Sequence, residues 1–498
     1  MRAALLAPYR RAPHSLSAPY KHASRFLFLQ NQPSQTPRER FSSHSSQLTT
    51  SLPSQAPKRV LQHVPLSTLL RSLTVLSVAA LPSSLLSAVI TVTKKWSRLI
   101  SASAILRWPV DQTFYKTFCI GSEKQRIEKN IGSLRAMGLD GIVLAFARES
   151  KLGNNIQTAN LTPADPSLRE WVDMNLETID CLTGADYLAL RLTGAGPAAV
   201  EAMDDFSELD STSDGYMASL ERLNVFGDAL SEILTAAANK DVKVLIDAES
   251  SVHQPAIDRL ALDAMARFNK DRAVVYNTYQ MYLKKGVSKM IRHLKTSKER
   301  GFVIGLKLVR GAYLHTEPNP SSLNSSKENT DESYDNGVRF LLGAELDAAK
   351  YGTSTATSLE RGEKPWAAEV MLATHNQASV DNALSLWRGS THPPRVTNRN
   401  GGNVRSLAFA QLMGMADEVS LGLVSERKGN GTSDHEADSS EPLPPIGVYK
   451  YTIWGSFEEC LLYMLRRAEE NQDAVARTRG SAMEVLREVG RRANPFKS

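Results

Sequence analysis

From about Ala136 onward, short apolar runs alternate with longer segments of helical periodicity. Such alternation is typical of repeated βα units, in which a strand is followed by a helix that packs on it. In most runs apolar and polar residues do not alternate, which is typical of strands that are covered on both faces. The runs span residues 141–147, 187–193, 242–248, 273–278, 303–309, 369–374, 406–411 and 448–451. Eight strands of this kind predict a (β/α)₈ TIM-like barrel.

A doubly wound open sheet is the alternative architecture. No Gly-x-Gly-x-x-Gly motif follows the first run, which disfavours the dinucleotide-binding version of that fold. Polar insertions rich in Gly and Ser interrupt the pattern, and we expect surface loops there. They span residues 318–333, 352–364, 389–403 and 426–445.

The N-terminal region differs from the rest of the chain in charge. Residues 1–110 contain fourteen Lys or Arg and a single acid, Glu39. The first 65 residues are rich in Arg, Ser and Pro, which is typical of a mitochondrial transit peptide, although a disordered basic tail has the same composition. We expect three regions: a transit or disordered region at 1–65, a helical region at 66–135 and the barrel at 136–495.

Residues 72–93 form an uncharged stretch of 22 residues between Arg71 and Lys94. This length could cross a bilayer. Ser, Thr and Pro82 dilute its hydrophobicity, which favours instead a bent pair of amphipathic helices, packed on a domain or lying at an interface. The three cysteines, Cys119, Cys181 and Cys460, have no metal-site or disulfide spacing, so we expect no metal.

Polar residues close several of the apolar runs. In a barrel the carboxyl ends of the strands face the active site, so these residues should converge. An Asp in such a place is also a common helix N-cap, but the coincidence of several polar endings favours a site. The candidates are Asp247, Asn277, Lys307, Arg310, Thr374, His375, Asn376 and Tyr451.

The last predicted helix starts with a capping box from Ser456 to Glu459. Its apolar stripe leaves Arg466 on the opposite side, with Glu470 one turn further on. Periodicity allows two interpretations: a solvated face with an i,i+4 ion pair, or a carboxylate clamp formed by Arg466 and Arg467. The helical pattern alone does not separate them.

The motifs occur in an order that resembles the proline dehydrogenase family. They are residues 244–249 (VLIDAE), 276–280 (YNTYQ), 307–313 (KLVRGAY), 373–376 (ATHN), 411–415 (QLMGM), and Tyr451 through Arg466-Arg467. The resemblance covers residues 69–492 and is strongest to the mitochondrial eukaryotic form. It implies a distorted (β/α)₈ barrel that binds FAD and oxidises L-proline to 1-pyrroline-5-carboxylate, the first step of proline catabolism.

The same resemblance implies the partners and the location. Electrons would pass to ubiquinone or another membrane acceptor, and the protein would associate peripherally with the matrix side of the mitochondrial inner membrane, with no nucleic-acid partner.

Residue roles follow from the matching motif positions. Asp247, Lys307, Tyr313 and Tyr451 would be catalytic, and the substrate would be bound by Arg191, Leu308, Leu412, Arg466 and Arg467. The cofactor would contact Tyr276, Asn277, Lys307, Arg310, Gly311, Ala312, Thr374, His375, Asn376 and Glu470. Gly311 would keep close approach to the cofactor open.

Two positions depart from the family pattern: Arg191 stands where most members have Lys, and Ile453 where a Pro is usual. The bulk of Tyr451 favours proline over 4-hydroxyproline. Alternatives are a hydroxyproline or other small-amine flavin dehydrogenase, a degenerate flavin-binding barrel with weak or altered turnover, and a relative of methylenetetrahydrofolate reductase.

Overall fold

The computed structural model leaves out the first 60 residues, so the expected transit region lies outside the described part of the chain. The stretches 344–364, 390–401 and 430–445 are also left out, and with them most of three predicted insertions. The structure describes residues 61, 64–79, 81–147, 161–209, 212–213, 215–314, 316–343, 365–389, 402–429, 446–470 and 475–493.

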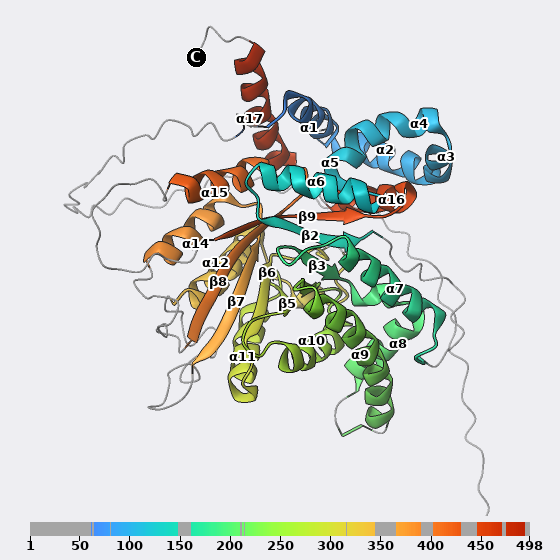
Figure 1. The fold of residues 1–498 in the computed structure, drawn as a ribbon, viewed down its shortest axis with the longest axis vertical. Helices are drawn as coiled ribbons and strands as arrows, with labels where there is room; N and C mark the ends of the chain where they lie inside the picture. Colours follow the sequence, from blue (N-terminus) through green and yellow to red (C-terminus); the bar gives the residue numbers. More distant parts are fainter. Residues whose placement is uncertain are drawn as a thin grey trace, which may run out of the picture. The chain divides into compact units, whose positions relative to one another are not determined.

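Eight parallel strands form a closed barrel (Figure 1). Each predicted run overlaps one of them, and closure results from pairing of the last strand with both the first and the seventh. The predicted barrel is therefore confirmed, and the open sheet is excluded. The strands are β2 (Gly141–Phe146), β3 (Tyr187–Leu190), β4 (Lys243–Ile246), β5 (Val275–Gln280), β6 (Ile304–Val309), β7 (Trp366–Ala373), β8 (Gly402–Leu412) and β9 (Gly447–Trp454).

A short strand that the sequence pattern did not reveal, β1 (Cys119–Gly121), pairs with the end of β9. β8 pairs with β9 only as far as Tyr451, and β1 pairs at Ile453 and Trp454. The N-terminal region thus contributes a strand to the last turn of the barrel wall.

Helices follow the strands around the barrel (Figure 1). After β4, β5 and β7 a single described helix follows, whereas α8 and α9 both follow β3 and α16 and α17 both follow β9. The helices are α6 (Lys124–Ala136), α7 (Pro166–Asp180), α8 (Pro197–Glu208), α9 (Tyr216–Asn239), α10 (Gln254–Phe268), α11 (Gly286–Arg300), α12 (Lys327–Leu341), α14 (Gln377–Gly389), α15 (Asp417–Gly429), α16 (Phe457–Glu470) and α17 (Val475–Ala493).

The N-terminal region packs against the last helices. The uncharged stretch forms α1 (Leu66–Ala79) and α2 (Ser83–Lys95), separated at Pro82, as the amphipathic prediction requires. α1 lies beside α17, and α2 contacts α16 (Figure 1). Shorter elements follow: α3 (Ser97–Ala102), α4 (Ala104–Val110), the π-helix η2 (Asp111–Tyr115) and α5 (Lys116–Phe118). Among the described helices, none has the length and hydropathy of a membrane span.

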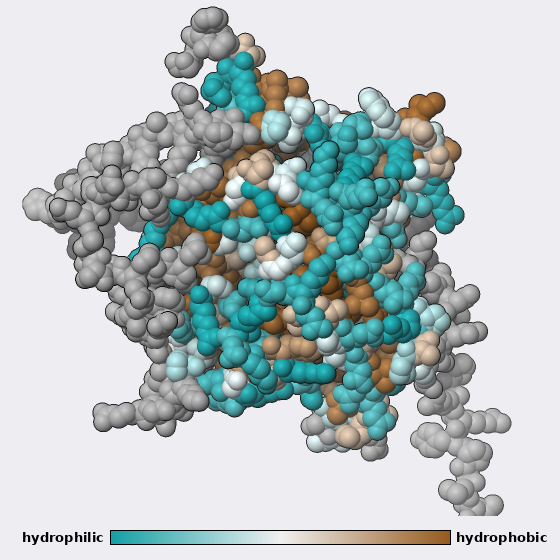
Figure 2. Space-filling view, viewed as in Figure 1, coloured by the Kyte–Doolittle hydropathy of each residue, from teal (hydrophilic) through white to brown (hydrophobic). Residues whose placement is uncertain are grey.

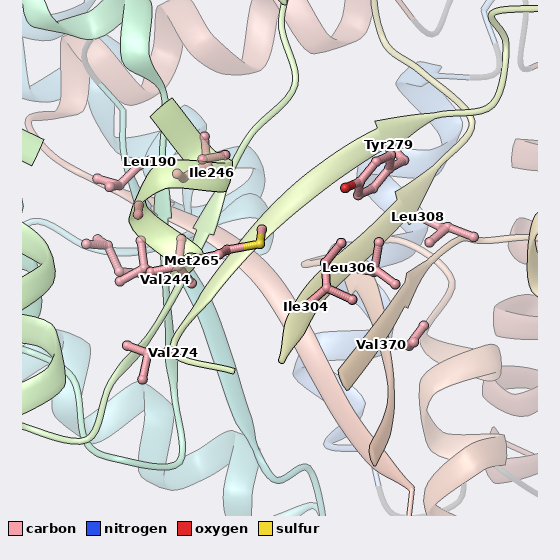
Figure 3. Packing of buried hydrophobic residues seen from close by; sticks show 14 of the residues in the cluster. Leu190, Val244, Ile246, Met265, Val274, Tyr279, Ile304, Leu306, Leu308 and Val370 are labelled. Atoms are coloured by element: carbon pink, nitrogen blue, oxygen red, sulfur yellow. The ribbon is translucent and has the colours of Figure 1, made fainter. Parts of the chain in front are cut away.

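The main hydrophobic core lies between the barrel wall and the outer helices. On β6 the side chains of Ile304, Leu306 and Leu308 share one face and are completely buried (Figure 3). Because strand side chains alternate, Lys307 and Val309 point the opposite way, into the barrel. Residue parity on each strand therefore decides which side chains can reach a site inside the barrel.

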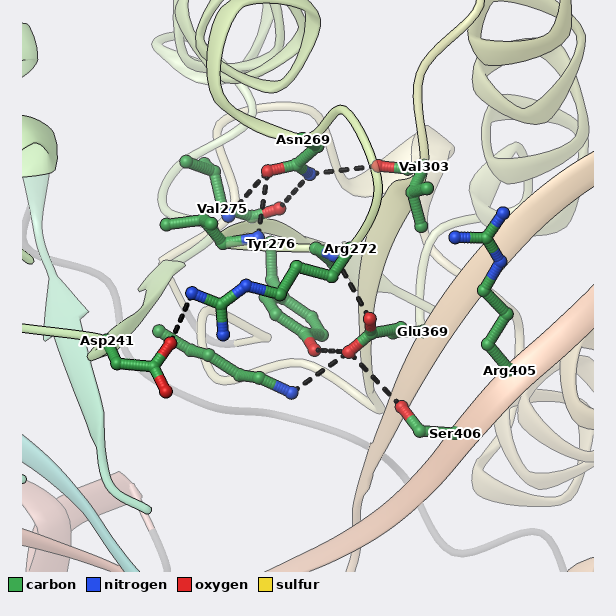
Figure 4. Close-up of polar contacts among 12 residues, drawn as sticks. Asp241, Asn269, Arg272, Val275, Tyr276, Val303, Glu369, Arg405 and Ser406 are labelled. Carbon is green, nitrogen blue, oxygen red and sulfur yellow. Dashed lines mark hydrogen bonds and ion pairs between the residues drawn. The ribbon is translucent and has the colours of Figure 1, made fainter. Parts of the chain in front are cut away.

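A charged network fills the barrel near the N-terminal ends of the strands (Figure 4). Glu369 of β7 accepts hydrogen bonds from Lys243 Nζ at 2.9 Å and from the Tyr276 hydroxyl at 2.8 Å. The Ser406 hydroxyl donates to the same carboxylate at 3.2 Å. Burial pushes the pKa of Glu369 upward, but the neighbouring Lys243 and the hydrogen bonds lower it overall. This network closes the end of the barrel opposite the carboxyl ends of the strands.

The insertion predicted at 318–333 is not an irregular loop throughout. A short 3₁₀ helix spans Pro320–Ser322, and α12 begins at Lys327 with Ser326 as its N-cap. The hydroxyl of Ser326 accepts a hydrogen bond from the backbone N–H of Asn329 at 3.2 Å. The Ser and Asn residues that suggested a loop therefore include a helix start.

Candidate active site

A cavity of about 560 Å³ lies inside the barrel at the carboxyl ends of the strands. This size is within the usual range of small-molecule sites, about 300–1,000 Å³. The position is that of the active site in other barrels of this type. Its lining includes most of the residues predicted for the site: Arg191, Asp247, Lys307, Arg310, Gly311, Ala312, Tyr313, Thr374, His375, Asn376, Leu412, Tyr451 and Arg467.

Asp247 is the centre of the polar contacts in the cavity. Its Oδ1 accepts a hydrogen bond from Lys307 Nζ at 2.5 Å, and its Oδ2 accepts one from the Tyr451 hydroxyl at 2.9 Å. Arg191 Nε lies 4.0 Å from Oδ2. Burial raises the pKa of Asp247, but the cations Lys307 and Arg191 outweigh it, so the pKa is lowered overall. Asp247 is therefore a carboxylate at neutral pH.

Tyr451 and Tyr313 present neutral phenols to the cavity. Burial, with Asp247 next in effect, raises the pKa of Tyr451 well above its ordinary value. Burial and then Glu249 raise the pKa of Tyr313 to about 12. The ammonium of Lys307 also lies 5.3 Å from the centre of the Tyr451 ring, a cation–π distance. Asp247, Lys307 and Tyr451 thus fix one another.

Tyr463 of α16 brings three guanidinium groups together. The guanidinium carbons of these residues, Arg191, Arg466 and Arg467, lie 5.3, 5.7 and 5.2 Å from its ring centre.

Helix α16 begins at the predicted capping box. The Ser456 hydroxyl accepts a hydrogen bond from the backbone N–H of Glu459 at 3.3 Å, and the Glu459 carboxylate accepts one from the backbone N–H of Ser456 at 3.0 Å.

Arg466 and Arg467 are half-buried, and Arg467 lines the cavity while Arg466 is not among its lining residues. The fully solvated face that periodicity allowed is therefore excluded. The side chain of Glu470, the predicted cofactor contact at the end of this helix, lies outside the described residues.

Arg310 is held on several sides near the mouth of the cavity. Its Nε donates to Asp331 at 2.5 Å, Nη1 to the Thr374 hydroxyl at 2.7 Å and Nη2 to the Ser379 hydroxyl at 2.9 Å. Its guanidinium lies 4.4 Å from the centre of the Tyr334 ring. These contacts fix a planar cation at the cavity wall before any ligand is bound.

His375 is oriented by the neighbouring strand end. The backbone N–H of Leu412 donates to His375 Nε2 at 3.0 Å. A ring nitrogen that accepts carries no proton, so the imidazole is neutral with its proton on Nδ1. Thr374 is fixed as well, because its hydroxyl also accepts from the backbone N–H of Asn376 at 3.1 Å.

Cations greatly outnumber acids in the lining of this cavity. Among the lining residues that the structure describes, the only acid is Asp247. The Lys and Arg residues are Arg191, Lys307, Arg310, Lys327 and Arg467. Lys327 is exposed and, like Arg310, pairs with Asp331. The buried or half-buried cations Arg191, Lys307 and Arg467 still outnumber Asp247, and this excess favours ligands that bring negative charge.

Besides Arg466, three other predicted site residues do not line the cavity. Tyr276 shares the inner face of β5 but lies deeper, in the network around Glu369 (Figure 4). Asn277 faces outward, and its side-chain amide donates to Asp258 of α10 at 2.9 Å. Leu308 belongs to the outer core (Figure 3). The structure thus places all three apart from the other site residues.

Gly311 lines the cavity, and the packing of the chain itself gives a reason for a glycine at this position. Its φ is +138°, a backbone conformation that side chains rarely adopt. A Cβ atom built there would lie 1.8 Å from Cδ1 of Tyr282. The glycine is therefore required by the packing of the chain itself, before any cofactor is considered.

Several lining residues were missed, among them Thr278, Gln280 and Tyr463. The Thr278 hydroxyl donates to the Ile246 carbonyl at 2.7 Å, and the Gln280 amide donates to the Glu249 carbonyl at 2.9 Å. Strand alternation could have found the first two, because they share the face of β5 that excludes Asn277. Tyr463 lies away from the apolar stripe of its helix and carried no separate signal.

Comparison with known proteins identifies a family. A family model described as proline dehydrogenase matches residues 145–480. The probable mitochondrial proline dehydrogenase of Schizosaccharomyces pombe is 28% identical over 402 residues, which cover 73% of this chain and 76% of that protein. Mitochondrial proline dehydrogenase 1 of Drosophila melanogaster is 30% identical over 277 residues, covering 53% of this chain and 34% of that protein.

Among solved structures, proline utilization A (PutA) from Bdellovibrio bacteriovorus has a similar fold. Its TM-score is 0.53 at 14% sequence identity, and the match covers 82% of this chain and 36% of the PutA chain. The chain thus spans about a third of the length of the fly and Bdellovibrio proteins. At this identity the structural likeness concerns the fold alone.

Proposed function

Because the chain belongs to the proline dehydrogenase family, we propose that it oxidises L-proline to 1-pyrroline-5-carboxylate, the first step of proline catabolism, with FAD as cofactor. Electrons pass to ubiquinone. The observation that carries this proposal is the cavity at the strand ends, in which Arg191, Lys307 and Arg467 face a single lining carboxylate, Asp247, while Arg310 is paired with Asp331. The carboxylate of proline and the pyrophosphate of FAD would supply the missing negative charge.

The substrate carboxylate is assigned to the arginines around Tyr463. Arg191 and Arg467 line the cavity from different elements, the end of β3 and helix α16. Guanidinium groups bind carboxylates through charge-assisted, frequently bidentate hydrogen bonds. Arg466 is next to them in the chain, and its approach to the same Tyr463 ring supports a secondary role in holding the pair.

The remaining lining residues fit FAD. Arg310 is a preoriented cation suited to phosphate oxygens, and Thr374, His375 and Asn376 offer neutral polar groups next to it. Lys307 would lie near the isoalloxazine ring. Gly311 and Ala312 have no side chain or a very small one and would leave room for the cofactor. When bound, FAD supplies the acceptor for the hydride that leaves the substrate. The role of Glu470 stays a prediction.

Asp247 provides the charge that the reaction needs at the substrate. Proline loses a hydride from the ring carbon next to nitrogen and a proton from the nitrogen, so positive charge develops along that C–N bond. An ionised carboxylate fixed by Lys307 and Tyr451 would stabilise that charge without reorganisation. Tyr451, Tyr313 and Leu412 would exclude water around the ring.

Tyr451 also bears on the choice between proline and 4-hydroxyproline. Its hydroxyl is bonded to Asp247 and its ring lies against Lys307, so it cannot turn away without breaking both contacts. An additional ring hydroxyl would therefore meet a fixed phenol. We expect kcat/KM for L-proline to exceed that for 4-hydroxyproline, and similar values for both would reject this part of the proposal.

Anaerobic titration of the purified protein with L-proline tests the reaction. The oxidised flavin absorption should bleach as proline is added, and 1-pyrroline-5-carboxylate should accumulate when a water-soluble dye reoxidises the protein. A bound flavin that proline does not bleach would support a degenerate barrel instead. A protein that binds no flavin, even after reconstitution, would contradict the assignment of FAD to the cavity.

Exposed apolar side chains support peripheral association with the mitochondrial inner membrane. They gather on the short N-terminal helices, and Figure 2 shows hydrophobic atoms at the upper right, over the position of α3 and α4 in Figure 1. Residues 66–110 contain no acid. The exposed cations of this segment are Lys94, Lys95, Arg98 and Arg107. Its exposed apolar residues include Leu85, Val92, Trp96, Leu99, Ile105 and Trp108. Apolar and cationic side chains together are typical of a surface that meets anionic lipid.

Sedimentation with vesicles of phosphatidylcholine and cardiolipin tests this surface. Ile105 and Trp108 are 85% and 67% exposed, so Ile105→Glu and Trp108→Glu should leave the fold intact while weakening vesicle binding. Met217→Glu is the matched control, because Met217 is 65% exposed on α9. Equal binding by all three variants and the parent protein would contradict the assignment to these helices.

A further inference from the structure

The segment 311–317 follows β6 and brings Tyr313 into the wall of the cavity at the strand ends. Much of this segment is open to solvent, because Gly311, Ala312 and Leu314 are exposed. Burial of its apolar side chains therefore contributes little to holding the segment in place. A side chain on a loop is placed precisely only where the loop itself is fixed.

Backbone hydrogen bonds fix the chain on both sides of this segment. Before it, the N–H of Tyr282 donates to the Arg310 carbonyl at 2.7 Å, which continues the pairing of β5 with β6. After it, the N–H of Asn324 donates to the Tyr282 carbonyl at 2.8 Å, and Leu283 and Leu323 form an antiparallel bridge. Between these two attachments the segment depends on contacts of its side chains.

Glu317 supplies such contacts through a buried carboxylate. It is 7% exposed, although its neighbours Thr316 and Pro318 are exposed. Its Oε1 accepts a hydrogen bond from the hydroxyl of Ser251, in the loop after β4, and its Oε2 accepts one from the hydroxyl of Tyr282, after β5, at 3.3 Å. Burying a carboxylate is costly unless it is hydrogen-bonded, so moving Glu317 away from these donors is unfavourable. One carboxylate thus joins the loops at the carboxyl ends of β4, β5 and β6.

Tyr282 contacts the segment at both of its ends. Its hydroxyl donates to Glu317, and its ring lies so close to Gly311 that a Cβ atom there would be 1.8 Å from Cδ1. Burial and then Glu317 raise the pKa of Tyr282 above its ordinary value, so the phenol remains a donor. Within the segment, the N–H of Thr316 donates to the Tyr313 carbonyl at 3.0 Å and closes a turn. Tyr313 is therefore carried by a turn whose two ends rest on one fixed ring.

We propose that Glu317 is a positioning residue, which holds Tyr313 in the cavity wall by joining its loop to the loops after β4 and β5. This inference rests on the proposed function, because the place of Tyr313 matters to turnover only if the cavity encloses proline. Glu317 is not among the residues that line the cavity, so it acts through Tyr313. Without Glu317, the segment would have to be ordered each time proline binds, and the cost of that ordering weakens binding.

Steady-state kinetics with a water-soluble dye test this role in a double-mutant cycle. Glu317→Ala should lower kcat/KM for L-proline about tenfold, equivalent to about 1.4 kcal/mol, mainly through a higher KM and with flavin content unchanged. In a Tyr313→Ala background the same substitution should lower kcat/KM by about twofold at most, because the side chain that Glu317 positions is gone. Equal losses in the two backgrounds would overturn the proposal, since general damage to the fold does not depend on Tyr313.

Two milder variants keep the test decisive if Glu317→Ala folds poorly. Glu317→Gln keeps an oxygen that can accept from Ser251 and should restore most of kcat/KM, whereas Ser251→Ala removes that donor and should reproduce part of the loss. Asn319→Ala is the matched control on the same loop, because its side-chain oxygen accepts from the N–H and the hydroxyl of Ser321 at 3.2 and 2.6 Å, within the loop. A loss in Asn319→Ala as large as in Glu317→Ala, or kinetics of Ser251→Ala equal to those of the parent, would contradict the assignment.

Hydrogen exchange followed by mass spectrometry separates this inference from the proposed function, because it needs no turnover. In Glu317→Ala the amides of residues 248–253 and 311–321 should exchange faster than in the parent, whereas in Asn319→Ala those of residues 248–253 should not. Unchanged exchange in Glu317→Ala would overturn the inference, whether or not the protein oxidises proline. Faster exchange in a protein whose parent does not reduce the dye with proline would confirm the attachment of the loop and show that the proposed function is wrong.

Discussion

Replacing Lys307 by Met removes one charge from the ion pair at the centre of the cavity. The Lys307 side chain is 7% exposed and that of Asp247 is 13% exposed. Methionine has a similar length and no charge, so the substitution tests electrostatics with little change in packing. Asp247 keeps the Tyr451 hydroxyl and the more distant Arg191 as partners.

The magnitude follows from the two separations. At an effective dielectric constant of about 20, charges 2.5 Å apart attract by about 7 kcal/mol, and charges 4.0 Å apart by about 4 kcal/mol. Desolvation of the ammonium, which costs several kcal/mol, is no longer needed in the variant. Breaking a buried pair by removing one partner typically costs about 3–5 kcal/mol, and we expect Lys307→Met to lower the free energy of unfolding by that amount at neutral pH.

The pH dependence gives a second, independent test. The pKa of Asp247 is lowered in the folded protein, so its contribution is present above the unfolded pKa and is lost as the pH falls through the folded pKa. Lys307 is the largest lowering influence, so the folded pKa rises in the variant. Protonation of Asp247 then favours the folded state, and the stability deficit of Lys307→Met should shrink between about pH 7 and about pH 5.

Urea unfolding followed by tryptophan fluorescence measures the deficit at each pH. Lys243→Met is the matched control, because Lys243 also pairs with a buried carboxylate, Glu369, at 2.9 Å, but in the network remote from the cavity. Both variants should lose stability, and only Lys307→Met should weaken proline binding. A deficit for Lys307→Met that stays constant or grows toward pH 5 would refute the electrostatic reasoning.

Three further substitutions have defined outcomes. Arg467→Lys keeps the charge but loses the planar fork, so KM for proline should rise by the value of one charge-assisted hydrogen bond, about 1.5–3 kcal/mol, with flavin content unchanged; an unchanged KM would exclude Arg467 from the carboxylate site. Gly311→Ala should lower the unfolding midpoint, because its Cβ would lie 1.8 Å from Tyr282, whereas the control Gly132→Ala, with open space around it, should not. Ser456→Ala removes the N-cap of α16 and should cost about 0.5–2 kcal/mol in urea unfolding, and no loss would mean that the capping box contributes nothing.

The barrel itself could be predicted because strand burial leaves a strong local signal. The run 141–147 is apolar throughout and 303–309 is apolar apart from Lys307, since each strand is covered on both faces, and each run contains an observed strand. β1 could not be found in this way. It has three residues, and its pairing with Ile453 and Trp454 depends on where the N-terminal region packs, which no local pattern records.

Predicted residues that follow a strand line the cavity, whereas those inside a strand divide by the face they occupy, and Lys307 and Tyr451 are on the inner face. Asp247 and Thr374 follow their strands, and both line the cavity. Asn277 and Leu308 lie inside strands, where a shift of one residue changes the face. The resemblance identified the motifs, but it did not show which of their residues point into the barrel. The structure places the side chains of Asn277 and Leu308 on the outer face.

Arg191, the departure from the family pattern, has a structural explanation in Tyr463. The guanidinium of Arg191 lies 5.3 Å from the centre of that ring and 4.0 Å from Asp247, so one planar cation spans the end of β3, the end of β4 and helix α16. A lysine could supply the charge but could not stack in the same way. Because Arg467 approaches the same ring from its own helix, Tyr463 sets the distance between the two arginines. The proposed clamp for the substrate carboxylate thus depends on a tyrosine that neither motif order nor helical spacing had marked, and the arginine at 191 is matched to it.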